Sequence, residues 1–215
     1  LASSTISEVI KSMLENNVSR LVVMKGGSPI GIITEKDVGL FLFSETSHQG
    51  IDRIPLERIM NDIEFVKQDA SIEECAEIML DKKISSLAIG TKNEVQGIFT
   101  KTDLVRHYIK HNSKNVKISD YMAMEYVFTH TAAPLYKVVR KMLEHKISRI
   151  IVKNQSETPV GVISFRDLFR ISLELGSQGD DILSENIRSG FLSEEGFGGV
   201  SLARDVMSEG IISAR

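Results

Sequence analysis

The same spacing of apolar residues occurs three times along this 215-residue chain. In each copy, apolar residues recur at offsets 0, 3, 4, 7 and 8, a pattern that places them on one face of an amphipathic helix. The three sets are Ile6, Val9, Ile10, Met13 and Leu14; Ile72, Cys75, Ala76, Met79 and Leu80; and Leu135, Val138, Val139, Met142 and Leu143. A pattern that repeats in this way predicts a chain built from similar structural units.

Two β-rich segments, separated by a polar turn, follow each predicted helix and indicate a hairpin. The second segment ends in a heptapeptide, which reads GIITEKD at 31–37, GIFTKTD at 97–103 and GVISFRD at 161–167. A second helix follows each heptapeptide, and β-prone stretches precede the helices of the later copies at 63–66 and 126–128. The unit is therefore strand, helix, strand, strand, helix, which predicts an α/β (α+β) fold. The first copy lacks its first strand because the chain begins almost at the helix.

These units divide the chain. We expect repeats at 1–43, 56–112 and 117–175, linkers at 44–55 and 176–200, and the opening of a fourth repeat at 201–215. The intact polypeptide is expected to extend beyond both ends. Repeats one and two are consecutive and joined by a short linker, so we expect them to pack as a pair, with repeat three left to pair with a fourth.

The three units resemble the cystathionine-β-synthase (CBS) domain family, whose hallmark is a β-α-β-β-α unit ending in Gly-hydrophobe-x-Thr/Ser-x-x-Asp. The resemblance covers nearly the whole chain. It implies that two units pack sheet to sheet as a pseudo-twofold pair, called a Bateman module, with up to two ligand clefts. It also implies an adenosyl ligand, namely AMP, ADP, ATP or S-adenosylmethionine, and no required cofactor.

The heptapeptides contain the residues best suited to bind such a ligand. Glycine lets the backbone approach a ligand closely, and a Thr or Ser hydroxyl at a helix N-terminus suits a phosphate oxygen. An Asp three residues later can accept hydrogen bonds from two ribose hydroxyls. The candidates are Thr34 and Asp37, Thr100 and Asp103, and Ser164 and Asp167. The alternative is that each pair caps its helix, since Ser/Thr-x-x-Asp/Glu is a capping box, and the two roles are compatible.

Two arginines are candidate phosphate ligands. Arg20 and Arg149 follow a serine at the start of a strand, where nucleotide-sensing members such as the kinase gamma subunits often carry His-Arg aimed at phosphate. The second copy has Ser86 there. The alternative for Arg20 and Arg149 is an ordinary surface arginine.

Four residues match the first-strand positions that flank adenine in family members, although they could equally form sheet core: Ile63, Phe65, Tyr126 and Val127. In the third copy we count one extra residue between this strand and its helix.

Composition excludes several other classes of protein. The formal charge of −3, from 26 basic and 29 acidic residues, does not favour nucleic acid. No apolar run approaches the roughly 20 residues of a membrane span, and no signal peptide is evident, so a cytoplasmic protein is expected. The single cysteine, Cys75, is expected in the core. His107 and His111 could share a metal, but no third ligand is evident.

No catalytic motif is present, and we expect no enzyme. The sequence favours a regulatory module that senses an adenine nucleotide or S-adenosylmethionine, associates as a homo-oligomer such as a dimer, and signals to an unknown effector protein or domain. One alternative is a dimerisation scaffold with degenerate clefts. Another is the regulatory part of a larger enzyme, transporter or transcription factor.

Overall fold

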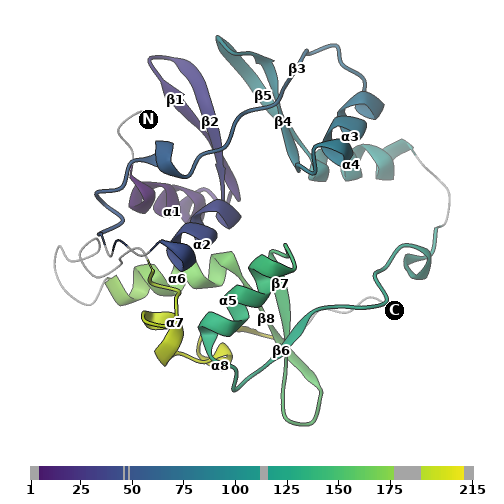
Figure 1. Ribbon diagram of the computed structural model, residues 1–215. Helices are drawn as coiled ribbons and strands as arrows, with labels where there is room; N and C mark the ends of the chain where they lie inside the picture. The colour runs from purple at the N-terminus through teal and green to yellow at the C-terminus, as the bar shows by residue number, and fades with distance from the viewer. Residues whose placement is uncertain (1–4, 46, 48, 112–115, 177–189, 211–215) are drawn as a thin grey trace. The chain divides into compact units, whose positions relative to one another are not determined.

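The structure is a computed structural model that describes residues 5–45, 47, 49–111, 116–176 and 190–210 (Figure 1). It confirms the α/β fold class and the order of elements expected for the repeats. Repeat one consists of α1 (Ile6–Glu15), β1 (Arg20–Lys25), β2 (Ser28–Thr34) and α2 (Glu35–Ser44). Repeat two consists of β3 (Phe65–Val66), α3 (Ile72–Asp81), β4 (Ser86–Thr91), β5 (Glu94–Thr100) and α4 (Lys101–His111).

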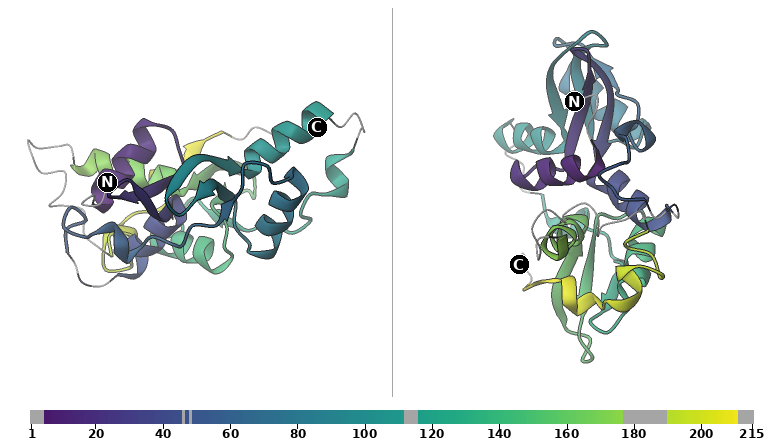
Figure 2. Two further views of the ribbon diagram at one scale, coloured as in Figure 1. Left: turned by 90° about the horizontal axis from the view of Figure 1, so that it is seen from above. Right: turned by 90° about the vertical axis from the view of Figure 1, so that its left-hand side faces the viewer.

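Repeat three has the same order and is followed by further short elements. It consists of β6 (Phe128–His130), α5 (Leu135–Glu144), β7 (Arg149–Lys153), β8 (Pro159–Ser164) and α6 (Phe165–Gly176). The chain continues through α7 (Phe197–Val200), α8 (Ala203–Val206) and β9 (Ser208–Glu209), which lie along the third repeat (Figure 2). Short 3-10 turns at Leu56–Arg58 and Ile118–Asp120 lie at the start of the second and third repeats, before their first strands.

The first strands begin later than the sequence suggested, so that β3 is shorter than expected and β6 is shifted. We expected them at 63–66 and 126–128, but β3 begins at Phe65 and β6 at Phe128. Each pairs in parallel with the strand that follows its helix, with Phe65 opposite Ala88 and Phe128 opposite Ile151. Both phenylalanines lie seven positions before their helix, so the extra residue counted in the third copy was wrong.

Each first helix ends in the same way. The residue after the C-cap adopts a left-handed conformation at Asn17 (φ 52°), Lys83 (φ 55°) and Lys146 (φ 55°). The next backbone N–H, that of Val18, Ile84 or Ile147, donates to the carbonyl of Met13, Met79 or Met142, respectively. This is a Schellman motif, in which the final apolar residue packs back on the helix.

The described chain forms two compact units whose boundaries do not follow the repeats. One unit contains residues 22–32 and 61–124, and the other contains residues 3–21, 33–60 and 125–215. The hairpin of repeat one therefore belongs with repeat two, whereas its helices belong with repeat three. Sequence periodicity could not show this division, because it depends on contacts between repeats.

The core of the first unit is the interior of repeat two. Val66, Cys75, Met79 and Leu87 are its buried members, and Ile84 and Phe99 are among the side chains packed on them. Cys75 is 5% exposed, which confirms the expectation that it lies in the core. Burial, with a smaller contribution from Glu74, raises the pKa of the Cys75 thiol.

The core of the second unit is formed by helices α1 and α2 together with α5 and α6. Fully buried members include Ile10, Leu42 and Phe169. A Cβ at Gly39 would lie 2.3 Å from the Phe165 ring, so only glycine allows α2 to approach α6 this closely. The predicted linkers also contribute to this unit: their buried hydrophobic side chains are Ile51, Ile54 and Leu192, while residues 177–189 lie outside the described part.

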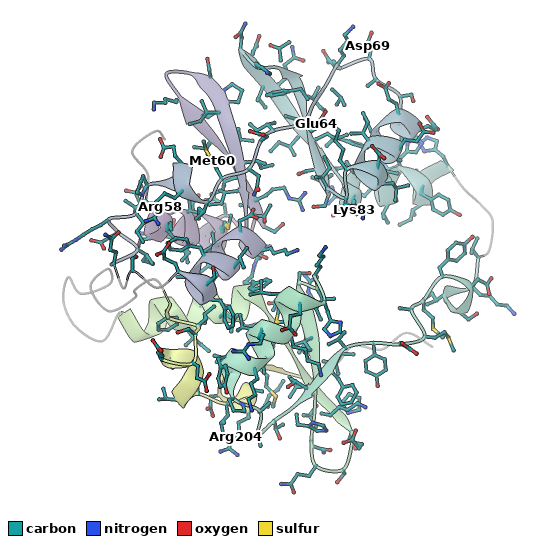
Figure 3. All side chains as sticks on the ribbon, viewed as in Figure 1. Arg58, Met60, Glu64, Asp69, Lys83 and Arg204 are labelled. Atoms are coloured by element: carbon teal, nitrogen blue, oxygen red, sulfur yellow. The ribbon has the colours of Figure 1, made fainter. Side chains whose placement is uncertain are left out.

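The left-handed lysine after α3 provides a test of local stability. Lys83 (Figure 3) adopts a left-handed backbone conformation, which costs a residue with a Cβ roughly 1–2 kcal/mol. Glycine avoids this cost but loses roughly 0.5–1 kcal/mol more conformational entropy on folding. Lys83→Gly should raise the free energy of unfolding by about 0.5–1 kcal/mol. Urea denaturation measures this, with Lys83→Ala as a control that keeps the Cβ. Equal effects of the two substitutions would contradict the explanation.

Candidate functional site

The candidate Thr or Ser and Asp residues of the signature lie at the three corners where the second hairpin strand meets the second helix. At each corner one carboxylate oxygen, Oδ2 of the signature Asp, accepts two hydrogen bonds from the Thr or Ser three residues earlier. Thr34 donates its backbone N–H (2.8 Å) and its hydroxyl (2.6 Å) to Asp37. The corresponding distances are 3.0 and 2.6 Å for Thr100 and Asp103, and 2.8 and 2.5 Å for Ser164 and Asp167.

These bonds confirm the capping box in repeats one and two, and in repeat three they show its half in which the Ser164 N–H donates to Asp167. At Thr34 and Asp37 the box is reciprocal, since the Asp37 N–H also donates to the Thr34 hydroxyl oxygen at 3.4 Å, and Asp103 does the same to Thr100. A hydroxyl has one proton, and here it is donated to the carboxylate. In this arrangement the hydroxyl can accept a hydrogen bond but cannot donate one to a phosphate. The Oδ1 oxygen of each Asp takes no part in these bonds to the Thr or Ser.

The neighbours of that Oδ1 oxygen differ among the repeats. For Asp37, no hydrogen bond to Oδ1 is present among the described residues of its compact unit. Asp103 Oδ1 accepts from Arg106 Nη1 at 2.9 Å, an ion pair on the first turns of α4. Asp167 Oδ1 accepts from the Ser208 hydroxyl at 2.7 Å. The three carboxylates are therefore held alike through Oδ2 but differ in how open Oδ1 is to a ligand.

The opening of the predicted fourth repeat joins the edge of repeat three. Strand β9 pairs with β8, with Ser208 opposite Val162 and Glu209 opposite Gly161. Repeat two opens in an equivalent way, because Asn61 forms an antiparallel bridge with Ile32, one residue after the signature glycine of repeat one. No such strand joins repeat two, since β5 pairs only with β4 among the described residues.

The signature glycines accordingly have different neighbours. A Cβ at Gly161 would lie 2.6 Å from the carbonyl oxygen of Ser208 and 3.0 Å from the sulfur of Met207. At Gly97 the nearest atom would be Ile89 Cδ1, at an ordinary 3.8 Å. Glycine is therefore required at position 161 because the backbone of Ser208, and not a ligand, approaches it closely.

The first-strand candidates lie at the start of the two sheets. Ile63 precedes β3 and Phe65 begins it, whereas Tyr126 and Val127 precede β6. By the strand register, Phe65 corresponds to Phe128 and Ile63 to Tyr126. Phe128 is a position that the sequence analysis missed, and its equal distance from the following helix could have revealed it.

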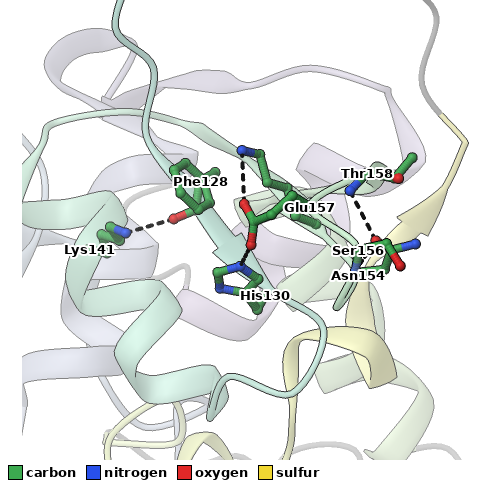
Figure 4. A network of polar contacts seen from close by, with 8 residues as sticks. Phe128, His130, Lys141, Asn154, Ser156, Glu157 and Thr158 are labelled. Carbon is green, nitrogen blue, oxygen red and sulfur yellow. Dashed lines mark hydrogen bonds and ion pairs between the residues drawn. The ribbon is translucent and has the colours of Figure 1, made fainter.

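The Phe128 ring is part of a polar network (Figure 4). Lys153 Nζ lies 3.9 Å from the centroid of that ring and 5.5 Å from that of Tyr126. Glu157 joins Lys153 at 3.4 Å and His130 at 2.7 Å. Desolvation lowers the pKa of Lys153, but hydrogen bonds to Tyr126 and Glu157 outweigh it and hold that pKa above its usual value. The ammonium group of Lys153 therefore covers one face of the Phe128 ring.

The two arginines begin strands next to the corners. Arg20 is the first residue of β1, and Arg149 is the first of β7. Arg149 lies opposite Ser164 across the β7–β8 pair, so their side chains share one face of the sheet, and Ser86 lies opposite Thr100 in the same way. A cation at position 149 therefore lies beside the corner of repeat three.

Neither a metal site nor a membrane span is found in the described parts of the chain. No group of three or more His, Cys, Asp or Glu side chains is placed to hold a metal among these residues. The rings of His107 and His111 stack at 4.1 Å, and His111 Nδ1 contacts the His107 carbonyl oxygen at 2.9 Å. None of the helices searched is long and apolar enough to cross a bilayer.

The fold and corners define a tandem-repeat protein, and the chain belongs to the CBS domain family. The CBS domain model matches residues 1–41, 56–110 and 118–174. The uncharacterized protein MJ1225 of Methanocaldococcus jannaschii is 24% identical over 184 residues, covering 79% of this chain and 65% of that protein. Its crystal structure, described as a candidate archaeal homologue of g-AMPK, superposes with a TM-score of 0.80 at 22% identity over 99% of this chain and 78% of that one.

Two other relatives share part of their length with this chain. An uncharacterized 17.7 kDa protein of Acidianus ambivalens is 34% identical over 105 residues, which is 47% of this chain and 61% of that protein. A homoserine O-acetyltransferase of Methanohalobium evestigatum is 22% identical over 170 residues, 77% of this chain and 33% of that enzyme. The chain thus spans less than two thirds of the length of these relatives and of MJ1225.

The corner of repeat two predicts a measurable acid response. The Thr100 hydroxyl is the main cause that lowers the pKa of Asp103, and the Thr100 N–H and Arg106 lower it further against the opposing effect of desolvation. Because the folded-state pKa lies below the unfolded value of about 3.9, this carboxylate stabilises the fold above about pH 4. That contribution is lost as the pH falls through the folded-state pKa.

Thr100→Val should therefore raise the pKa of Asp103 toward its usual value, as measured by carboxyl ¹³C NMR titration, and should make acid unfolding less steep. Thr100→Ser retains the hydroxyl and should behave as the wild type. An unchanged Asp103 pKa in Thr100→Val would show that the hydroxyl does not hold the carboxylate.

Proposed function

We propose that this chain is a regulatory, non-catalytic module that binds an adenosyl ligand, such as AMP, ADP, ATP or S-adenosylmethionine, at its strand-to-helix corners. The observation that carries the proposal is the Asp37 corner, where Oδ2 is fixed by Thr34 and Oδ1 has no hydrogen bond among the described residues of its unit. A fixed carboxylate with a free oxygen is preorganised to accept a ribose hydroxyl. The likeness to MJ1225, described as a candidate homologue of g-AMPK, supports an adenine nucleotide.

The pairing of strand edges supports repeats one and two as one ligand-binding pair. The opening of repeat two joins the edge of repeat one at Ile32, and β9 joins repeat three at the equivalent Val162. We propose that repeat three forms the same kind of pair with a fourth repeat that starts near residue 201. The repeat boundaries 1–43, 56–112 and 117–175 are part of this proposal.

We further propose that the corners are occupied unequally. A ligand at Asp37 meets no hydrogen bond to Oδ1 within its unit, whereas one at Asp103 must compete with Arg106, and one at Asp167 must compete with Ser208. Arg106 could then turn toward a phosphate group, which favours nucleotides over uncharged adenosyl compounds at that corner.

The likeness to homoserine O-acetyltransferase favours a second candidate function, that of the regulatory part of a larger enzyme. In this case the same ligand-binding corners would control a catalytic domain outside this sequence. The two functions differ in effector and share the binding site.

An Asp103 substitution tests the ribose contact. If the carboxylate accepts ribose hydroxyls, Asp103→Ala should weaken the adenine nucleotide about tenfold to a hundredfold at that corner, because a hydrogen bond to a charged group contributes roughly 1.5–3 kcal/mol. Isothermal titration with AMP, ADP, ATP and S-adenosylmethionine measures this, with GTP as a negative control.

The variant also removes a cap, so it needs a matched control. Ser71→Ala in the same repeat removes the cap of α3, where the Ser71 hydroxyl accepts from Glu74 N–H at 3.0 Å. This should cost about 0.5–2 kcal/mol of stability and leave ligand affinity unchanged. The proposal fails if no adenosyl compound binds the wild type, or if Asp103→Ala binds as Ser71→Ala does.

We also propose that two copies of the chain associate through the helices of repeat two. Leu80 is 72% exposed and Val105 is 56% exposed. The positions equivalent to Val105, Gly39 and Phe169, are buried where the helices of repeats one and three pack on each other. In repeats one and three, the equivalent helical faces are buried against each other. The exposed face of repeat two can be buried in the same way against the identical face of a second copy of the chain.

Multi-angle light scattering should accordingly give the mass of two chains, and Val105→Asp should give the mass of one. A single-chain mass for the wild type at micromolar concentration would exclude a homodimer and leave another partner for this face.

A further inference from the structure

The Ser208 hydroxyl occupies the acceptor that a ligand of repeat three would need. Ser208 Oγ lies 2.7 Å from Asp167 Oδ1, while Ser164 donates twice to Oδ2. If Asp167 binds ribose as proposed above, we infer that Ser208 is a specificity residue that competes with ribose hydroxyls for this carboxylate. This inference rests on the proposed function and concerns a residue outside the signature heptapeptides.

The backbone, rather than a chance side-chain conformation, fixes the position of Ser208. Ser208 lies opposite Val162 in the β8–β9 pair, and the N–H of Gly210 donates to the Val160 carbonyl at 3.0 Å. The carbonyl of Ser208 lies so close to Gly161 that a Cβ there would meet it at 2.6 Å. Strand β9 therefore holds the hydroxyl against the first turn of α6 whenever it is paired with β8.

The competition has a defined chemistry. A carboxylate is an acceptor only, and the Ser208 hydroxyl is a donor to it, as are the 2′ and 3′ hydroxyls of ribose. A ribose diol that spans the carboxylate donates to both oxygens, and at Oδ1 it competes with the Ser208 hydroxyl, which already takes one of the acceptor sites of that oxygen. When it is displaced, this hydroxyl is exposed and returns to water, so the cost is the net value of one charge-assisted hydrogen bond.

The same contact links ligand binding to the fourth repeat. Ser208 belongs to the strand that opens that repeat, and its hydroxyl bonds to the helix that carries Asp167. A ligand that takes Asp167 Oδ1 removes this side-chain bond and leaves β9 held by its backbone pairs. The binding equilibrium at Asp167 and the pairing of β9 therefore oppose each other.

Ser208→Ala tests this directly with AMP as the probe, measured by isothermal titration. Removing the competing donor should tighten AMP on the order of tenfold at one site. Ser208→Thr keeps a hydroxyl and should bind as the wild type, and Glu209→Ala, on the same strand, should change nothing. 2′,3′-Dideoxy-AMP lacks the competing hydroxyls, so its affinity should be the same for the wild type and Ser208→Ala.

A double-mutant cycle assigns the effect to the carboxylate. The gain from Ser208→Ala should disappear when Asp167→Asn is also present, since the two residues act through one hydrogen bond. If Asp103→Ala weakens AMP but Ser208→Ala leaves every site unchanged, the inference is wrong and the proposed function stands. If AMP binds neither the wild type nor Ser208→Ala, both are overturned for this nucleotide.

Discussion

The hydrogen bonds from a Thr or Ser to the Asp three residues later determine how the rest of each repeat is arranged. They join the last residue of the second hairpin strand to the first turn of the second helix, with hydroxyl-to-carboxylate distances of 2.5–2.6 Å at all three corners. The corner fixes the direction in which the helix leaves the sheet, and it also fixes the carboxylate. The stability of the fold and the geometry of the proposed site therefore depend on the same few atoms, and a substitution there must be tested for both effects.

Because Oδ2 is committed to the fold, differences among the repeats are concentrated at Oδ1. Arg106 contacts it in repeat two and Ser208 in repeat three. Neither residue belongs to the signature: Arg106 is on the next turn of the same helix, and Ser208 is 41 residues further along the chain. Identical signatures can thus give corners with unequal access for ligands, which explains how one repeated sequence could bind ligands with graded affinity.

The features that the sequence predicts well are local. Apolar spacing located the first helices, whose apolar faces depend only on residues within ten positions of one another. The first strands were harder to predict, because β3 has only two residues and its extent depends on pairing with β4. The grouping of the repeat-one helices with repeat three, through Gly39 and Phe165, and the Ser208 contact join residues far apart in the chain. Periodicity within one repeat contains no information about such contacts.

The signature glycines show why a shared motif need not have one physical role. Sequence reasoning assigned them to the close approach of a ligand, yet at Gly161 the atom that excludes a Cβ is the carbonyl oxygen of Ser208, and at Gly97 a Cβ would meet only Ile89 Cδ1 at van der Waals distance. At position 161 a glycine is needed because another strand joins the edge of the hairpin there. Since β5 has no such neighbour among the described residues, Gly97 leaves its edge able to accept one. Glycine thus allows β9 to pair with β8 at Gly161, whereas at Gly97 it lies on a strand edge with no neighbour among the described residues.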